Sequence, residues 1–199
     1  MLLILAGKSA SGKDTLLNEL IKNQNFNSLV STTTRPMRDG EKEGKEYFFV
    51  SKEQFFNLQR QNKFLEYRSY KTLVNNKSDI WYYGMTKQKL DPDKNYAVIL
   101  DLTGAKACKD YYKDLENVKC VYIEASDNIR EKRAIHRKSF DRTEWDRRLI
   151  TDKSDFSDEK IQEVCDFCIK NEDVSLSESV QAILNEISSE YDLLDEIEK

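Results

Sequence analysis

The chain has 199 residues, of which 39% are hydrophobic and 34% are charged. This length favours one domain with insertions over two domains, and the hydrophobic content is enough for one buried core. A net charge of −4 gives no general case for binding nucleic acid or a membrane surface. Residues 152–199 hold 15 acidic and 4 basic side chains, which leaves 21 acidic and 28 basic ones in residues 1–151. The first three quarters of the chain are therefore expected to attract anions.

A short apolar run at residues 1–6 begins the chain and predicts a buried strand in a cytoplasmic protein. The run is too short to span a membrane, and it lacks the basic flank and cleavage site of a signal peptide. Among the four cysteines, Cys165 and Cys168 are the only close pair, and the single histidine, His136, is far from them in sequence. This spacing argues against a zinc site, and we expect buried thiols.

Strands and helices alternate along much of the chain. Apolar, β-branched runs predict strands, and a helical pattern follows each of them. The predicted strand and helix pairs are 2–6 with 13–22, 96–101 with 103–114, 118–123 with 127–138, and 167–169 with about 175–187. This alternation predicts a parallel sheet covered by helices. The acidic last dozen residues either extend the final helix or fray.

Two segments interrupt this alternation. After the first helix come the Thr/Arg/Gly-rich residues 31–46 and short aromatic strand candidates at 47–50, 64–70 and 79–84. We interpret them as an inserted small β-rich subdomain. Residues 129–158 are highly charged and contain no strand pattern, which predicts a helical flap.

A glycine-rich loop directly follows the first predicted strand and opens the first helix. Its sequence, GKSASGK at residues 7–13, matches the pattern GxxxxGK in the strand–loop–helix context that gives the pattern its meaning. The glycines allow the backbone N–H groups to surround a phosphate at a helix N-terminus, and Lys13 adds a cation for the β- and γ-phosphates. The residues expected to contact ATP here are Gly7, Ser9, Ala10, Ser11, Gly12, Lys13, Asp14 and Thr15.

The position after Lys13 departs from the usual pattern. Asp14 occurs where a Ser or Thr ordinarily binds magnesium, and Thr15 follows it. Either Thr15 supplies the hydroxyl, or Asp14 contacts the ion directly or through one of its waters. We therefore expect Mg²⁺ as the cofactor, with Asp14 and Thr15 as its candidate ligands.

A second candidate phosphate site lies in residues 31–40, STTTRPMRDG, where Arg35 and Arg38 accompany several hydroxyls and a proline. Arginine suits a bound phosphate because its guanidinium can donate hydrogen bonds to two phosphate oxygens at once. The motifs that follow are Gly44, Tyr47, Phe49-Val50-Ser51, Phe55, Phe64-Leu65-Glu66-Tyr67, Tyr82-Tyr83-Gly84 and Ile99-Leu100-Asp101. With these motifs the chain closely resembles the guanylate kinase family from Leu2 to about Ile187.

The resemblance implies that residues 31–85 bind GMP. It assigns the GMP phosphate to residues matching Arg35, Arg38, Tyr47 and Tyr83. The family contacts guanine at four further positions, of which this chain keeps Ser31 and Glu66 but has Met85 in place of a Ser or Thr and Thr103 in place of an aspartate. The residues expected to bind GMP are Ser31, Arg35, Arg38, Tyr47, Glu66, Tyr83, Thr86, Asp101, Thr103 and Arg148.

Glu66 and Ser31 suit guanine chemically. A carboxylate can accept hydrogen bonds from the N1–H and N2–H₂ groups of guanine, and a serine hydroxyl can donate to O6. Met85 has no useful donor for O6, although Thr86 is adjacent to it. The alternative for Glu66 is a surface charge at a strand edge.

The resemblance also makes the flap a lid whose arginines, matching Arg133, Arg137 and Arg148, close over the donor phosphates. Residues 130–148 contain eight Lys and Arg side chains, in agreement with this role. A solvated helix with internal pairs, such as Glu144 with Arg148 at i, i+4, is the alternative for any single arginine. The ATP contacts expected outside the loop are Arg133, Arg137 and Asn171, the last matching a family residue near adenine.

Together these patterns predict an α/β protein with the three-layer P-loop NTPase fold. A single kinase domain, residues 1–199, would consist of a core (1–30, 86–128 and 159–199), a monophosphate-binding insertion (31–85) and a lid (129–158). The expected reaction moves the γ-phosphoryl group of ATP to GMP or dGMP. Because the attacking oxygen is already anionic, no general base is needed. The candidate catalytic cations are Lys13, Arg38, Arg133 and Arg148.

Two other functions remain open from the sequence. Gly12-Lys13-Asp14 also resembles the loop of ribose bisphosphate phosphokinases, so the acceptor is alternatively ribose 1,5-bisphosphate or another nucleotide. A non-catalytic guanylate-kinase-like binding module is the second alternative, although the intact glycines and Lys13 argue against it. Neither nucleic acid nor a membrane is expected as a partner, and monomer and homodimer are both compatible with the sequence.

Overall fold

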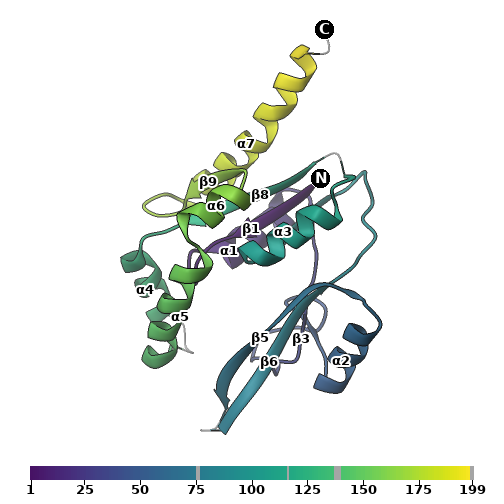
Figure 1. Cartoon of the computed structure of the whole chain (residues 1–199). Coiled ribbons are helices and arrows are strands. Elements are labelled where there is room, and N and C mark those ends of the chain that lie inside the picture. Colours follow the sequence, from purple (N-terminus) through teal and green to yellow (C-terminus); the bar gives the residue numbers. More distant parts are fainter. Residues whose placement is uncertain (75–76, 116, 137–139, 198–199) are drawn as a thin grey trace.

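A five-stranded parallel sheet forms the centre of the molecule. The structure is a computed structural model that describes residues 1–74, 77–115, 117–136 and 140–197. The strand order is β2-β7-β1-β8-β9 (Figure 1). The strands are β1 (Leu2–Ala6), β2 (Phe26–Ser28), β7 (Asn95–Ile99), β8 (Val118–Glu124) and β9 (Phe167–Lys170). The four predicted strands are thus confirmed, and β2 was not predicted.

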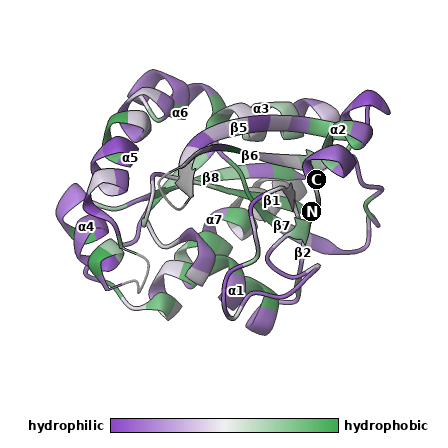
Figure 2. Cartoon of the chain, turned by 90° about the horizontal axis from the view of Figure 1, so that it is seen from below, coloured by the Kyte–Doolittle hydropathy of each residue, from purple (hydrophilic) through white to green (hydrophobic). Residues whose placement is uncertain are grey.

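Helices cover both faces of this sheet. On β1, Leu2 and Ile4 face one apolar cluster while Leu3 and Leu5 face another, because successive strand side chains point to opposite faces. The first cluster includes residues of α3 (Leu102–Tyr111) and α6 (Asp158–Val164), and the second includes residues of α1 (Lys13–Asn23) and α7 (Leu176–Ile197). Figure 2 shows hydrophilic residues on the outer sides of these helices. The predicted three-layer α/β fold is therefore confirmed.

A second, four-stranded sheet is built from the segment between α1 and β7. Its order is β4-β3-β6-β5, with β3 parallel to β4 and antiparallel to β6. Its elements are β3 (Thr32–Thr33), β4 (Phe48–Phe49), α2 (Lys52–Arg60), β5 (Phe64–Val74) and β6 (Lys77–Thr86). In Figure 1 the β5–β6 hairpin and α2 lie well below the central sheet. The aromatic strand candidates are confirmed, whereas α2 was missed.

Aromatic side chains hold α2 against the second sheet. The ring of Phe55, which is completely buried, stacks on Phe64 with centroids 4.4 Å apart and also contacts Tyr82. At Gly84 a side chain would place its Cβ 2.8 Å from the Phe64 ring and 3.0 Å from the Cβ of Tyr67. Glycine is required there so that the strands can approach the cluster.

The charged flap is helical, as predicted. It contains α4 (Asp127–Ile135) and α5 (Arg142–Asp155), which lie side by side in Figure 1. Ala134 of α4 and Trp145 of α5 pack in one cluster with Ala10 of the glycine-rich loop. The flap is thus attached to that loop by apolar packing.

The cysteine side chains differ from expectation at one position. All four are free thiols, and Cys168 is exposed, so the prediction of buried thiols is wrong there. The reason is that β9 lies at the edge of the central sheet. Among the described residues, no helix combines the length and apolar character needed to cross a membrane.

Replacing Phe55 with Ala should lower the free energy of unfolding by about 3–5 kcal/mol, because a large buried ring is removed from a packed cluster. Phe48→Ala is the matched control. Because Phe48 is 42% exposed, its replacement should lower the free energy of unfolding much less. Urea denaturation of both variants measures the difference. Equal losses would contradict a structural role for the Phe55 cluster.

Candidate functional site

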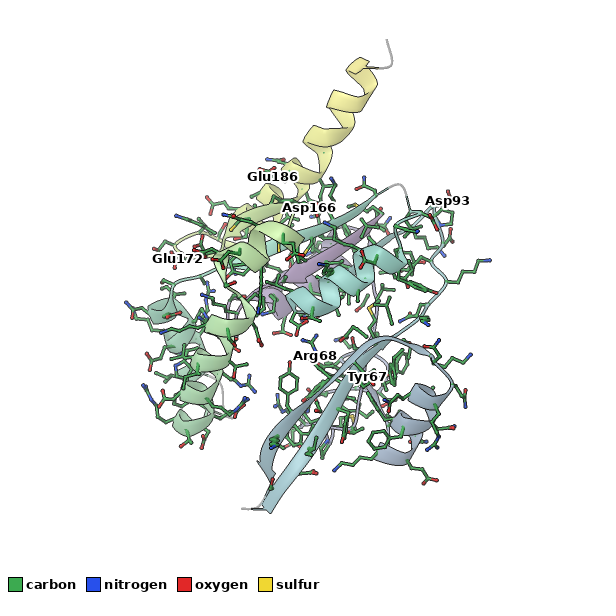
Figure 3. All side chains as sticks on the ribbon, viewed as in Figure 1. Tyr67, Arg68, Asp93, Asp166, Glu172 and Glu186 are labelled. Carbon is green, nitrogen blue, oxygen red and sulfur yellow. The ribbon has the colours of Figure 1, made fainter. Side chains whose placement is uncertain are left out.

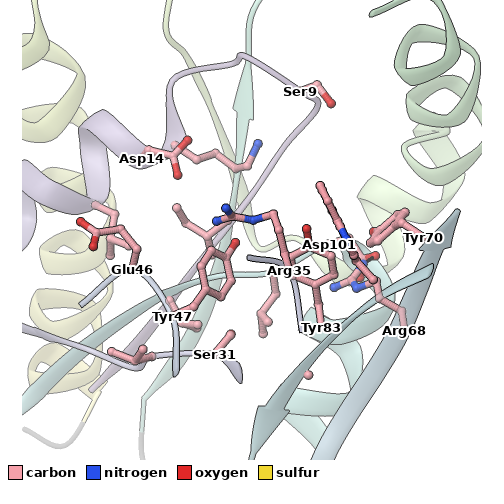
Figure 4. A pocket seen from close by; sticks show the side chains of 18 of the residues that line it. Ser9, Asp14, Ser31, Arg35, Glu46, Tyr47, Arg68, Tyr70, Tyr83 and Asp101 are labelled. Carbon is pink, nitrogen blue, oxygen red and sulfur yellow. Dashed lines mark ion pairs between the residues drawn. The ribbon is translucent and has the colours of Figure 1, made fainter. Parts of the chain in front are cut away.

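A single cavity of about 740 Å³ lies between the glycine-rich loop, the second sheet and α5 (Figure 4). Most predicted acceptor residues and part of the predicted loop line it. The predicted site residues in its lining are Gly7, Ser9, Lys13, Asp14, Ser31, Arg35, Arg38, Tyr47, Glu66, Tyr83, Asp101 and Arg148. The structure therefore brings the two halves of the predicted site to one cavity.

Other predicted residues do not line this cavity. Thr15 and Thr103 are exposed on their helices, and Thr86 pairs with Phe64 at the end of the hairpin. Arg137 lies outside the described residues. Within the described part of the chain, the predicted residues missing from the lining are Ala10, Ser11, Gly12, Thr15, Thr86, Thr103, Arg133 and Asn171.

The loop is curled around the ammonium group of Lys13. Its Nζ donates to the carbonyls of Gly7 at 2.7 Å and Lys8 at 2.8 Å. Gly12 has φ +104°, a left-handed conformation that a side chain would strain, and a Cβ there would collide with the Asn171 amide. The loop therefore needs glycine at residue 12 both for its curl and for the closeness of Asn171.

Arg133 and Asn171 support the loop from outside the cavity. The Ser11 carbonyl accepts hydrogen bonds from Asn171 Nδ2 at 2.8 Å and from an Arg133 guanidinium nitrogen at 3.0 Å. Arg133 also donates to the Asn171 carbonyl at 2.6 Å, and Ser179 donates to the Asn171 side chain at 3.0 Å. In this arrangement Arg133 positions the loop backbone, and its predicted contact with ATP stays a prediction.

A buried ion pair, which sequence reasoning missed, attaches both flap helices to the loop. Arg130 of α4 is 1% exposed and pairs with Asp152 of α5. Arg130 Nε donates to the Ser9 carbonyl at 2.8 Å, while Asp152 accepts from the Ser9 backbone N–H at 2.9 Å and from its hydroxyl at 3.2 Å. Ser9 is more than a hundred positions from both Arg130 and Asp152, so no local sequence pattern signals these contacts with the loop.

Arg130→Met should lower the free energy of unfolding by about 3–5 kcal/mol, because it leaves the Asp152 carboxylate buried without its cation. Arg142→Met is the matched control. Arg142 pairs with two carboxylates, those of Glu131 and Asp146, but it is 62% exposed, so its loss should cost much less than the loss of Arg130. Urea denaturation measures both values, and similar losses would show that burial of the Arg130 pair does not matter.

Arg35 occupies the part of the cavity predicted to bind the acceptor phosphate. It is 4% exposed, and its two terminal nitrogens donate to the two carboxylate oxygens of Glu41 at 3.0 and 2.7 Å. Its guanidinium also lies over the Tyr47 ring, 5.4 Å from the centroid. Burial alone would raise the pKa of Glu41, but hydrogen bonds from Arg35 and the Arg38 backbone lower it. Glu41 is therefore an anion that occupies two donors of Arg35, and a phosphate could take its place.

Tyr47 and Tyr83 stand beside Arg35, with ring centroids 5.8 Å apart. Burial, with smaller effects of Tyr83 and the Asp14 carboxylate, raises the pKa of Tyr47 to about 12. Burial also raises the pKa of Tyr83. Both hydroxyls therefore keep their protons at neutral pH and can donate to a phosphate.

Glu66 and Asp101 both lie near a cation that the sequence did not single out, Arg68. Figure 4 shows Asp101 beside Arg68. Arg68 is 3.8 Å from a Glu66 oxygen and pairs closely with Asp101. Burial raises the pKa of Glu66, while Arg68 and the Met85 backbone N–H oppose this effect. The cavity thus contains two carboxylates and one guanidinium in addition to the phosphate-binding cluster.

Arginines of α5 also line the cavity. Arg147 and Arg148 both hydrogen-bond to Glu144, and the Arg148 pair is the i, i+4 pair anticipated as an alternative to a lid role. The hydrogen bond from Arg147, together with that from Arg148, lowers the pKa of Glu144 to about 2. The two arginines are about four-tenths exposed, so they can exchange this partner for an anion.

Asp14 offers oxygen ligands for a divalent cation. Its side chain lines the cavity near Lys13, and it influences the Tyr47 hydroxyl electrostatically. Carboxylate oxygens suit magnesium, which also keeps waters and phosphate oxygens as ligands. Among the described residues, no group of three or more acidic, histidine or cysteine side chains could hold a metal by itself. The site therefore fits an ion that arrives with a phosphorylated ligand.

Comparisons with known proteins agree with this geometry. A family model described as guanylate kinase matches residues 1–190. A guanylate kinase of Clostridium tetani is 41% identical over 118 residues, which cover 57% of this chain and 53% of that protein, about half its length. A guanylate kinase of Wolinella succinogenes is 33% identical over 186 residues, covering 90% of this chain and 80% of that protein.

Solved structures show the same relationship. The crystal structure of a guanylate kinase from Anaplasma phagocytophilum superposes with a TM-score of 0.64 and 26% identity, covering 96% of this chain and 85% of that one. A gluconokinase from Sinorhizobium meliloti, at 12% identity and a TM-score of 0.51, shares the fold alone. The family match over residues 1–190 and the shared architecture lead to one conclusion: the chain belongs to the guanylate kinase family.

Proposed function

We propose that this chain is an ATP:GMP phosphotransferase, which moves the γ-phosphoryl group of ATP to the phosphate of GMP or dGMP. The observation that carries the proposal is the single cavity lined both by the loop around Lys13 and by Arg35, Tyr47 and Tyr83. Direct transfer requires the two phosphates to meet in one water-excluding space. The product pair would be ADP and GDP, which places the reaction in purine nucleotide metabolism.

Positioning and charge neutralisation account for most of the chemistry. The attacking oxygen of GMP is already anionic, so proton removal by a base is unnecessary. Lys13 would exchange the Gly7 and Lys8 carbonyls for the β- and γ-phosphates. Arg38 and Arg148 line the same cavity and would add positive charge as the transfer proceeds.

The GMP phosphate would bind among Arg35, Arg38, Tyr47 and Tyr83. Two guanidinium nitrogens of Arg35 donate to the two carboxylate oxygens of Glu41 and could bind a phosphate in the same bidentate way. The hydroxyls of Tyr47 and Tyr83 keep their protons and can donate as well. A phosphate presents the same kind of acceptor oxygens as Glu41. We therefore assign this cluster to the acceptor phosphate.

The metal that accompanies ATP would be Mg²⁺, with Asp14, which lines the cavity, as its protein ligand in preference to Thr15, which is absent from the lining. When bound, Mg²⁺ would offset the negative charge of the β- and γ-phosphates. Asp14 would hold the ion directly or through a water.

Residues 31–85 would act as the acceptor-binding part and residues 129–158 as the lid of one domain. The supporting observations are that residues 31–85 contain a packed cluster around Phe55 and that Trp145 of the flap packs with Ala134 and with Ala10 of the loop. Closure of these parts over bound substrates would exclude water and suppress ATP hydrolysis. The free thiols support a reducing compartment, so we place the protein in the cytoplasm.

An assay of ADP release tests the acceptor. GMP, dGMP, AMP, UMP, CMP and ribose 1,5-bisphosphate are compared at equal concentration with ATP and magnesium. GMP and dGMP should be the best acceptors. Preferred turnover of ribose bisphosphate would instead support the phosphokinase alternative, and absence of turnover with every acceptor would support a binding module.

Lys13→Met should reduce kcat by about 100- to 1,000-fold or more while the protein stays folded, because a preorganised cation is removed from the transferring phosphoryl group. Lys8→Met, in the same loop but outside the cavity lining, is the matched control and should keep near-normal turnover. Steady-state kinetics and circular dichroism check both variants. Near-normal turnover by Lys13→Met would refute the assignment of the loop.

Glu66→Ala should mainly raise the KM for GMP, by about 10- to 100-fold, because hydrogen bonds to a charged carboxylate are lost. The KM for ATP serves as the internal control, since Glu66 is on the acceptor side. An unchanged KM for GMP would show that Glu66 does not contact the base.

A further inference from the structure

The acceptor base needs a hydrogen-bond donor that the predicted residues do not fully supply. Guanine presents the O6 acceptor next to the N1–H and N2–H₂ donors. Glu66 can accept from N1–H and N2–H₂, but Met85, opposite Glu66 in the β5–β6 pairing, has no suitable donor and is completely buried in the apolar core. Ser31, which lines the cavity, can supply one donor to O6, so a second donor, in place of the one that Met85 lacks, must come from another side chain of the cavity.

Arg68 is placed to be that donor. It follows Glu66 by two positions on β5, so both side chains leave the same face of the strand, and both line the cavity. Tyr67 between them points to the other face, where it packs against Phe55 and Phe64 (Figure 3). The strand thus presents a carboxylate and a guanidinium side by side to the same ligand.

The surroundings of Arg68 hold its guanidinium in place. Asp101, at the N-terminus of α3, pairs with it, and Asp101 is itself fixed by the Gly104 N–H at 2.8 Å. The α3 backbone comes close here, since a Cβ at Gly104 would lie 3.3 Å from both the Arg68 guanidinium and the Glu66 carboxyl carbon. The glycine therefore leaves room for this charged cluster between α3 and β5.

The pairing leaves hydrogen-bonding capacity for a ligand. A guanidinium has five N–H donors, of which one carboxylate can take two. The 3.8 Å distance between Arg68 and the nearest Glu66 oxygen is too long for a hydrogen bond, so this ion pair does not occupy the Glu66 lone pairs. Both groups can therefore face a base at the same time.

We infer that Arg68 is a specificity-determining residue, which donates hydrogen bonds to O6 of the acceptor guanine while Glu66 accepts from N1–H and N2–H₂. Arginine bonding to the O6 side of guanine is a favoured pairing in nucleic-acid recognition. Adenine would turn its 6-amino donor toward the guanidinium donors, so AMP is discriminated against. This inference rests on the proposed use of GMP.

The test uses substrate analogues, because a loss of activity alone would also be expected if Arg68 only connected β5 with α3. 6-Thioguanosine monophosphate replaces O6 with sulfur, a poorer acceptor, and IMP keeps O6 but lacks the N2 amine. Wild-type enzyme should show a kcat/KM about 10-fold or more higher for GMP than for the 6-thio analogue, because a site built to bond an oxygen disfavours its weaker substitute. Equal values in the wild type would overturn the inference without any variant.

Arg68→Met keeps the aliphatic stem and removes the guanidinium. It should lower kcat/KM for GMP by about 10- to 100-fold and bring the GMP to 6-thio-GMP ratio close to one. The GMP to IMP ratio, which reports on Glu66, should persist. Arg68→Lys should recover part of the activity with GMP, since a lysine can still donate to O6.

Arg60→Met is the matched control, because Arg60 is an exposed arginine at the end of α2 and is absent from the cavity lining. It should leave all three substrates unaffected. Equal losses for GMP, 6-thio-GMP and IMP in Arg68→Met would overturn the inference and leave a purely structural role. Absence of GMP phosphorylation by the wild type would instead refute the proposed function, and the inference with it.

Discussion

The loop at residues 7–13 is curled around the ammonium group of Lys13, and many of the contacts that maintain the curl come from distant segments. Arg130 and Asp152 hold Ser9 from both flap helices, and Asn171 holds Ser11. A buried ion pair is stabilising only when its remaining hydrogen bonds are made, as they are here. The phosphate loop and the helices α4 and α5 therefore form one connected unit, so that a shift of these helices would be transmitted to the loop.

Several guanidinium groups that line the cavity are paired with carboxylates of the chain itself. Arg35 is paired with Glu41, Arg68 with Asp101 and Arg148 with Glu144. Several unpaired guanidiniums in one cavity would repel one another, and internal partners reduce that repulsion. An incoming phosphate offers the same bidentate acceptor geometry as a carboxylate. These carboxylates therefore reduce repulsion within the cavity and occupy donors that a phosphate could take instead.

The elements that were missed show the limits of local patterns. Helix α2 has only nine residues, which is a short stretch for a helical period, although Ser51 and Gln54 form a capping box that marks its start. Strand β2 has three residues, too few for a periodic signal. Arg68 lies in a strand rich in aromatic and charged residues, where an arginine also fits an exposed edge. Its importance becomes visible only when Asp101, 33 residues later, is brought beside it.

The sequence alone indicated the alternation of four strands with helices, the glycine-rich loop with Lys13, and the family resemblance, because hydrophobic periodicity and short motifs are local properties of the chain. It also indicated Arg35, Tyr47 and Glu66, which the fold brings to the same cavity as the loop. The tertiary structure decided which of these residues face the cavity, among them Asp14 but not Thr15, and revealed the Arg130–Asp152 pair and Arg68. Those features depend on contacts between distant segments, and such contacts exist only once the two sheets and the flap have packed together.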